Sequence, residues 1–182
     1  MAYMEINHHS EVLQMDMTFA AVIPEQWSAK KNRPVIWLLH GGYGCIQVAL
    51  THSEVFGNAG AFAAGDMEDK PYRKTDTGNW SKNRRAIMGT GDIHETQYSL
   101  KYCARMLLDS EKPLPRIYHA CGRMDPWYEM NQMVRGFFEG LKENPYRYHY
   151  AEYLEHGHTY PFIEQALKDY IRAMEILYSE KS

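Results

Sequence analysis

The sequence predicts an α/β protein with a mainly parallel central sheet and helices on both faces of that sheet. From about residue 34 onward, strand patterns and helical patterns alternate along the chain. A glycine-rich turn joins the first of these strands to its helix, as is typical of this class. The length of 182 residues suits a single domain, residues 1–182, built around one hydrophobic core.

The composition is that of an ordinary globular protein, with 45% hydrophobic and 24% charged residues. The net charge of −3 gives little electrostatic support for binding nucleic acid, so we expect no nucleic-acid partner. We also expect no membrane partner, because no run is long enough to span a bilayer and the first ten residues lack the apolar core of a signal peptide. Three cysteines without CxxC spacing favour a reducing compartment, and we expect a cytoplasmic protein.

The first quarter of the chain predicts three strands and a helix. Alternating polar and apolar residues predict strands at about 4–13 and 17–23. The apolar run over 35–39 (VIWLL) is typical of a buried strand. A diglycine turn at Gly41 and Gly42 then leads into a short helix, whose small residues suit close packing on a sheet.

The middle of the chain alternates in the same way. Residues 58–65 (NAGAFAAG) predict a strand, which opens into a polar stretch over 66–97. We expect this stretch to be a surface excursion that caps one edge of the sheet. A helix over 98–108 and a strand over 116–121 follow.

The last third predicts a helix, a strand and a final helix. Asp125 is expected to cap the first of these helices, with Pro126 at its first position. A strand over 146–154 and a helix from about Pro161 complete the order. The apolar stripe of the helix after Asp125 is expected to comprise Trp127, Met130, Met133, Val134, Phe137, Phe138 and Leu141.

Several residues with catalytic potential directly follow predicted strands: Gly41 and Gly42, Asp66, Asp125 and His158. Because the carboxyl ends of parallel strands meet at one edge, we expect these residues to share that edge. There an imidazole could accept a proton while a carboxylate fixed its tautomer, and the diglycine turn could present backbone N–H groups to an oxyanion. Structural interpretations remain open: Asp125 as a helix cap, His158 as a loop residue and the diglycine as an ordinary tight turn.

No Gly-x-Ser-x-Gly motif, which would supply a nucleophilic serine, occurs anywhere in the chain. Cys45 lies among apolar helical residues and Ser53 has no neighbouring glycines, so neither is a strong substitute. His156 and His158 with Asp125 could hold a metal, but spacing places no further ligand, and we expect none.

Four segments resemble one family: VIWLLHGG, GGYGCIQVAL, CGRMDPWYEMN and GHTYPF. They are similar to the esterase branch of the α/β-hydrolases, which contains esterase D (S-formylglutathione hydrolase), and most of all to bacterial tributyrin-esterase-like proteins. The resemblance covers nearly the whole chain. It implies a reduced α/β-hydrolase fold with Asp125 as the triad acid, His158 as the base and Gly41–Gly42 as the oxyanion turn. It further implies a small acyl ester or thioester substrate and no cofactor.

The chain departs from this family at its first glycine-rich turn. The family carries its oxyanion turn and its nucleophile elbow on separate segments, whereas here the two are fused, so that Leu39 stands where the serine is expected. The resemblance therefore implies an internal deletion of two βαβ units, roughly 60 residues. It implies a serine-esterase-type hydrolase that is impaired or inactive. The alternatives are a hydrolase with a substitute nucleophile or a non-catalytic binding or assembly module, and a homo-oligomer stays open. We expect the strand over 35–39 to pair with the strand over 58–65.

Overall fold

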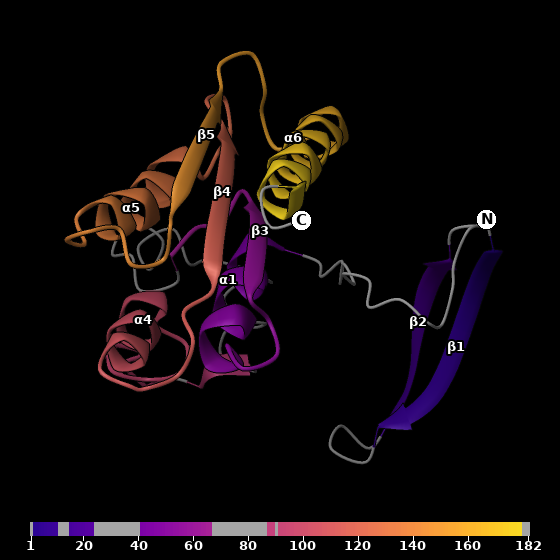
Figure 1. The fold of residues 1–182 in the computed structure, drawn as a ribbon, viewed down its shortest axis with the longest axis horizontal. Helices are drawn as coiled ribbons and strands as arrows, with labels where there is room; N and C mark the ends of the chain where they lie inside the picture. Colours follow the sequence, from indigo (N-terminus) through magenta and orange to yellow (C-terminus); the bar gives the residue numbers. More distant parts are fainter. Residues whose placement is uncertain (1, 11–14, 24–40, 67–86, 90, 180–182) are drawn as a thin grey trace. The chain divides into compact units, whose positions relative to one another are not determined.

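The computed structural model describes residues 2–10, 15–23, 41–66, 87–89 and 91–179 (Figure 1). The chain divides into two compact units, Met1–Trp37 and Leu38–Ser182. Leu39 and the predicted strand over 35–39 lie outside the described residues, as does the expected pairing of that strand.

The first unit contains an antiparallel hairpin of β1 (Ala2–Ser10) and β2 (Met15–Ile23). Its register pairs Ala2 with Ile23 and Ser10 with Met15. The sequence predicted both strands, and the last three residues of the first prediction, 11–13, lie outside the described residues.

The second unit is built on a parallel sheet with the strand order β3-β4-β5. The strands are β3 (Asn58–Phe62), β4 (Arg116–Gly122) and β5 (His149–Tyr153). The central strand β4 pairs with both neighbours and is buried from Ile117 to Gly122. A central strand that is covered on both faces has a nearly continuous apolar sequence, and β4 could therefore be predicted from the sequence.

Helices cover both faces of this sheet (Figure 1). The helices α1 (Gly42–Thr51), α4 (Leu100–Leu108) and α5 (Tyr128–Glu139) lie on one face, and α6 (Tyr160–Ser179) lies on the other. Because successive strand residues point to opposite faces, Ile117 packs in the core under α1, α4 and α5, whereas Tyr118 packs against α6. This arrangement confirms the predicted α/β class.

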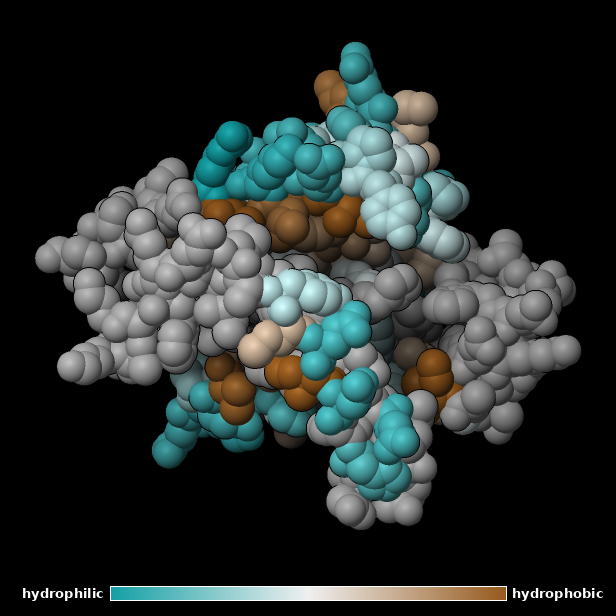
Figure 2. Space-filling model, turned by 90° about the vertical axis from the view of Figure 1, so that its right-hand side faces the viewer, coloured by the Kyte–Doolittle hydropathy of each residue, from teal (hydrophilic) through white to brown (hydrophobic). Residues whose placement is uncertain are grey.

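The outer surface of α6 is polar. Its exposed residues include Glu164, Gln165, Lys168 and Arg172, while Phe162 and Ala166 face the sheet and are buried. Figure 2 shows hydrophilic side chains over the upper part of this face, with hydrophobic side chains gathered beneath them. Of the described helices, none combines the length and apolar composition needed to cross a bilayer.

Two predicted strands are shorter than expected, because residues with positive φ interrupt them. The strand predicted over 58–65 ends at Phe62, and the next residue, Ala63, has a φ of 59°. The strand predicted over 146–154 begins only at His149, shortly after Arg147 with a φ of 43°. Left-handed backbone of this kind cannot continue a strand.

The helix after β4 also differs from its prediction. It begins at Tyr128 and has Trp127 at its N-cap position, so Asp125 and Pro126 lie in a preceding turn and not at the cap and first position. Trp127 and Met133 are exposed and do not belong to the buried stripe. The buried residues of α5 are Met130, Asn131, Val134 and Phe138.

Candidate active site

The loops that follow β4 and β5 are joined through their backbones. The Arg123 amide donates to the Tyr153 carbonyl over 2.9 Å, and the Met124 amide donates to the His156 carbonyl over 2.9 Å. At Gly122 an added Cβ would lie only 2.2 Å from the His156 carbonyl oxygen. A glycine is therefore required where these two loops meet, because any side chain would push them apart.

This contact brings Asp125 and His158 together. The Nδ1 atom of His158 lies 2.9 Å from Oδ2 of Asp125, whose side chain is fully buried. The other carboxylate oxygen accepts a hydrogen bond of 2.8 Å from the Trp127 amide. A carboxylate oxygen accepts, so Nδ1 carries the hydrogen and the Nε2 lone pair is left to accept a proton.

The His158 side chain is partly exposed. The side chain is 44% exposed, and its Nε2 has no hydrogen-bond partner within the described part of the chain. The Trp127 ring packs edge-on against the imidazole, with ring centroids 5.1 Å apart and an interplanar angle of 82°. From its apolar spacing, Trp127 was expected in the buried stripe of the helix. The sequence feature that could have indicated this contact is the position of Trp127, two residues after Asp125.

The diglycine turn lies at the same edge of the sheet. Gly41, with a φ of 91°, occupies the N-cap position of α1 and makes no side-chain capping bond. A Cβ on Gly42 would lie 2.5 Å from the carbonyl oxygen of Phe62, so the start of α1 abuts the carboxyl end of β3. Packing thus requires glycine at position 42, whereas the positive φ favours glycine at position 41. The amide groups of the first turn lack side-chain caps and lie at the positive end of the helix dipole.

Asp66 follows β3 but takes a different partner. Its carboxylate is fully buried and lies 3.1 Å from Nζ of Lys101 on α4. The residue therefore shares the edge of the sheet, as predicted, while its described ion pair joins the loop after β3 to α4.

The alternative nucleophiles occupy different positions. Ser53 is buried between the end of α1 and the start of β3, at the amino edge of the sheet and thus opposite to His158. Cys45 is half-buried in the first turn of α1 and packs against the core. Burial, with smaller contributions from Asp125 and Glu152, raises the pKa of Cys121 to about 12, so this thiol stays protonated at neutral pH.

The two histidines of the H-x-H pair have different surroundings. His158 contacts Asp125, whereas the ring of His156 packs against Tyr153 and Phe162, with centroid distances of 5.9 Å and 6.4 Å. In the part of the chain that the structure describes, no group of three or more His, Cys, Asp or Glu side chains is arranged to hold a metal ion.

A buried polar chain lies behind the site. His119 on β4 accepts a hydrogen bond at Nδ1 from the Tyr148 hydroxyl over 2.7 Å, and its Nε2 donates to Asn131 Oδ1 over 2.9 Å. Asn131 in turn donates to the Trp127 carbonyl over 2.9 Å. Burial lowers the pKa of His119 to about 4, so the ring is neutral at pH 7. Sequence reasoning missed this chain, because its members come from three separate segments.

No family model matches the chain, and no curated protein matches its sequence. Solved structures do match. The chain is similar to FphF, a fluorophosphonate-binding serine hydrolase of Staphylococcus aureus solved with substrate bound. The two sequences are 17% identical, the match covers 95% of this chain and 98% of that chain, and the TM-score is 0.75. It is also similar to S-formylglutathione hydrolase (FrmB) of Staphylococcus aureus, with 16% identity, the same coverage of 95% and 98%, and a TM-score of 0.72. These likenesses confirm the reduced α/β-hydrolase fold.

Proposed function

We propose that this protein is an esterase-type hydrolase by descent, which keeps the acid and the base of a catalytic triad and lacks the serine. The observation that carries the proposal is the 2.9 Å hydrogen bond between Nδ1 of the partly exposed His158 ring and Oδ2 of buried Asp125. The names of the two similar structures, both hydrolases, support the same type of chemistry.

The arrangement supports attack by water on a small acyl ester or thioester. His158 Nε2 takes a proton from water as the oxygen attacks the acyl carbon, and Asp125 stabilises the imidazolium. The first amides of α1, at Gly41–Gly42, are proposed to donate to the oxyanion. When the intermediate collapses, the imidazolium returns its proton to the departing alkoxide or thiolate. No cofactor takes part.

Without a serine no acyl-enzyme forms, so activity is expected to be weak. General-base assistance alone contributes on the order of 10²–10⁴-fold. Leu39, at the expected place of the nucleophile, cannot lose a proton. We therefore propose slow hydrolysis as the remaining activity, with small acyl esters as substrates.

The stretch over 66–97 is proposed to form a wall beside this site within one domain. The carboxylate of Asp66 at its start is held by Lys101 over 3.1 Å. At its end the Tyr98 carbonyl accepts a 2.6 Å hydrogen bond from Tyr43, and the Gln97 carbonyl accepts one of 3.1 Å from Gln47. Tyr43 belongs to the first turn of α1 and Gln47 to its middle, so both ends of the stretch are held by elements that begin or end at the edge that carries His158.

Hydrolysis of p-nitrophenyl acetate by the unmodified protein, His158→Ala and His156→Ala tests the proposal. We expect slow turnover that falls by at least about tenfold in His158→Ala and stays unchanged in His156→Ala, since only His158 contacts Asp125. A rate that is the same in His158→Ala would contradict hydrolysis at this site and favour a non-catalytic binding module. An equal loss in His156→Ala would favour a metal-dependent site.

Covalent labelling distinguishes the remaining alternative. Treatment with a fluorophosphonate and with iodoacetamide, followed by mapping of the adducts, is expected to leave Cys45 and Ser53 unmodified under conditions that label a serine hydrolase. A stoichiometric adduct at either residue, together with loss of turnover, would show a substitute nucleophile.

A further inference from the structure

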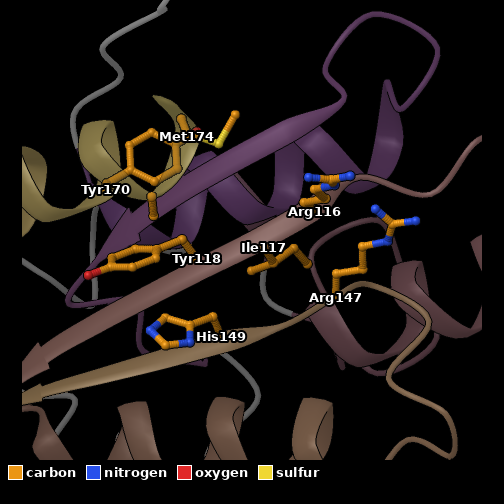
Figure 3. A pocket seen from close by; sticks show the side chains of 8 residues that line it. Arg116, Ile117, Tyr118, Arg147, His149, Tyr170 and Met174 are labelled. Carbon is orange, nitrogen blue, oxygen red and sulfur yellow. The ribbon is translucent and has the colours of Figure 1, made fainter. Parts of the chain in front are cut away.

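A pocket of about 340 Å³ lies at the amino ends of β4 and β5, beneath α6 (Figure 3). Tyr118 on β4 lines its floor, and Tyr170 and Met174 on α6 line its far wall. We propose that this pocket is a second binding site, separate from the hydrolytic one, for a small aromatic phosphate ester.

The pocket is distinct from the edge that carries His158. Arg116 begins β4, and Asp125 follows the end of the same strand. Seven residues of strand span roughly 20 Å. A ligand bound here would therefore not reach the proposed hydrolytic residues, so the inference stands independently of the proposed function.

Aromatic rings form the walls of the pocket. The Tyr118 ring stacks on His149 with a centroid distance of 5.3 Å and an interplanar angle of 30°. It also contacts Tyr170, with ring centroids 5.5 Å apart and tilted by 51°. Such walls favour a planar apolar group. Since an apolar cavity of about 150 Å³ holds benzene, the observed volume leaves room for one ring and a charged substituent.

Two arginines give the pocket a positive end. Figure 3 shows the guanidinium groups of Arg116 and Arg147 at the same end of the pocket. Neither has an acidic, hydrogen-bonding or aromatic side-chain partner in the part of the chain that is described.

The other arginines of this unit with described side chains are all partnered. Arg123, Arg135 and Arg172 pair with Glu152, Glu139 and Asp169 at 2.9, 2.9 and 3.3 Å, and Arg105 lies over the Phe137 ring at 5.4 Å. Two like charges at one end of a pocket repel each other unless an anion lies between them. A guanidinium group suits a phosphate because two of its N–H groups can donate in parallel to two phosphate oxygens.

The backbone that carries Arg147 is held in an unusual conformation. Arg147 has a φ of 43°, which side chains with a Cβ rarely adopt. Asn144 fixes this conformation: its carbonyl accepts from the Arg147 amide over 2.9 Å, and its side-chain Oδ1 accepts from the Tyr148 amide over 2.6 Å. Strained backbone that its neighbours hold in place is common at ligand sites.

Charge and shape together specify the ligand class. Two guanidiniums carry more positive charge than a single carboxylate neutralises, so a phosphate dianion fits the charged end best. The aromatic walls account for the ring. An aryl phosphate matches both the charged end and the aromatic walls. Inorganic phosphate matches only the charged end, and phenol matches only the aromatic walls.

Calorimetric titration with phenyl phosphate tests this inference, with inorganic phosphate and phenol as comparison ligands. We expect phenyl phosphate to bind at least about tenfold more tightly than either. Arg147→Gln and Arg116→Gln should each weaken phenyl phosphate at least about tenfold, by loss of a charge-assisted hydrogen bond. The matched control Lys142→Gln removes a positive charge from the same loop outside the pocket and should leave the affinity unchanged.

Three outcomes would overturn the inference: no saturable binding of phenyl phosphate, equal affinity for phosphate without the ring, or an equal loss in Lys142→Gln. Hydrolysis of p-nitrophenyl acetate, followed in the same variants, should be unaffected, which separates this site from the hydrolytic one. The urea midpoint of each variant verifies that it is folded.

A further variant, Met174→Ala, tests the apolar wall of the pocket. It should weaken phenyl phosphate and leave inorganic phosphate unchanged.

Discussion

His119 is a polar side chain placed wholly inside a hydrophobic core, and the structure shows what makes this position stable. Both ring nitrogens are satisfied, one by the Tyr148 hydroxyl and the other by Asn131, so the neutral ring leaves no polar atom without a partner. A protonated ring would carry a charge in a buried site and would need an acceptor where Tyr148 donates. The pKa of His119 is accordingly lowered to about 4.

We expect this histidine to make stability depend on pH. Well above pH 6.5 the ring is neutral in both the folded and the unfolded chain and contributes nothing to the pH dependence. As the pH falls from 6.5 toward 4, only the unfolded chain gains the proton, so the free energy of unfolding decreases. The expected loss between pH 7 and pH 5 is about 2 kcal/mol.

Urea unfolding at pH 7 and pH 5 measures this loss, with His119→Gln as the variant that lacks the titrating ring. The variant is less stable at pH 7, because the buried partners lose their hydrogen bonds, but its stability should change less between the two pH values. Equal losses in both proteins would show that His119 does not contribute to the pH dependence.

At the scale of elements, the site depends on the close approach of the loops after β4 and β5. Three backbone features join them: the amides of Arg123 and Met124 donate to the β5 loop, and Gly122 leaves room for the His156 carbonyl. The geometry of Asp125 and His158 is therefore set by main-chain contacts and not by the two side chains alone.

Gly122→Ala is expected to disturb this junction. The new Cβ would lie 2.2 Å from a backbone oxygen, which cannot move without shifting the loop, so we expect a loss of about 1–3 kcal/mol and reduced hydrolysis. Gly136→Ala is the matched control: it lies within α5 with nothing within 4 Å of the added carbon, and should be neutral or stabilising by about 0.5–1 kcal/mol. Thermal or urea unfolding measures both. Equal effects in the two variants would mean that the junction tolerates a side chain.

The elements that sequence predicted best are those with a clear apolar pattern. The strand predicted over 116–121 is β4, and the helix predicted over 98–108 is α4, which begins two residues later and ends at the predicted residue. The errors at 58–65 and 146–154 come from Ala63 and Arg147, because apolar periodicity does not report the sign of φ. Local capping rules likewise did not foresee the turn at Asp125.

The candidate site was predictable to the extent that strand order governs it. Asp125 and His158 follow adjacent parallel strands, so their approach could be inferred before any coordinates. The packing of Trp127 on His158 and the buried chain through His119 were not predictable, because both depend on contacts between segments far apart in sequence.

For the whole molecule, the Leu38–Ser182 unit has two ends with different chemistry. The carboxyl edge of the sheet carries the hydrogen-bonded pair of Asp125 and His158, and the amino edge carries the aromatic pocket with its two arginines. The fold matches α/β-hydrolase structures at only 16–17% identity. We propose that this fold retains the acid and the base of a hydrolytic site and lacks the attacking oxygen at the sequence position of Leu39.

The most direct measurement is the rate of p-nitrophenyl acetate hydrolysis by Leu39→Ser, with Leu38→Ser as the matched control and the urea midpoint as the check of folding. The account predicts that Leu39→Ser raises kcat/KM by at least about 100-fold, a small part of what a complete triad supplies. It also predicts that the introduced serine takes up a fluorophosphonate, and that adding His158→Ala abolishes the gain. A folded Leu39→Ser protein with neither a rate increase nor an adduct, or an equal gain in Leu38→Ser, would contradict the account.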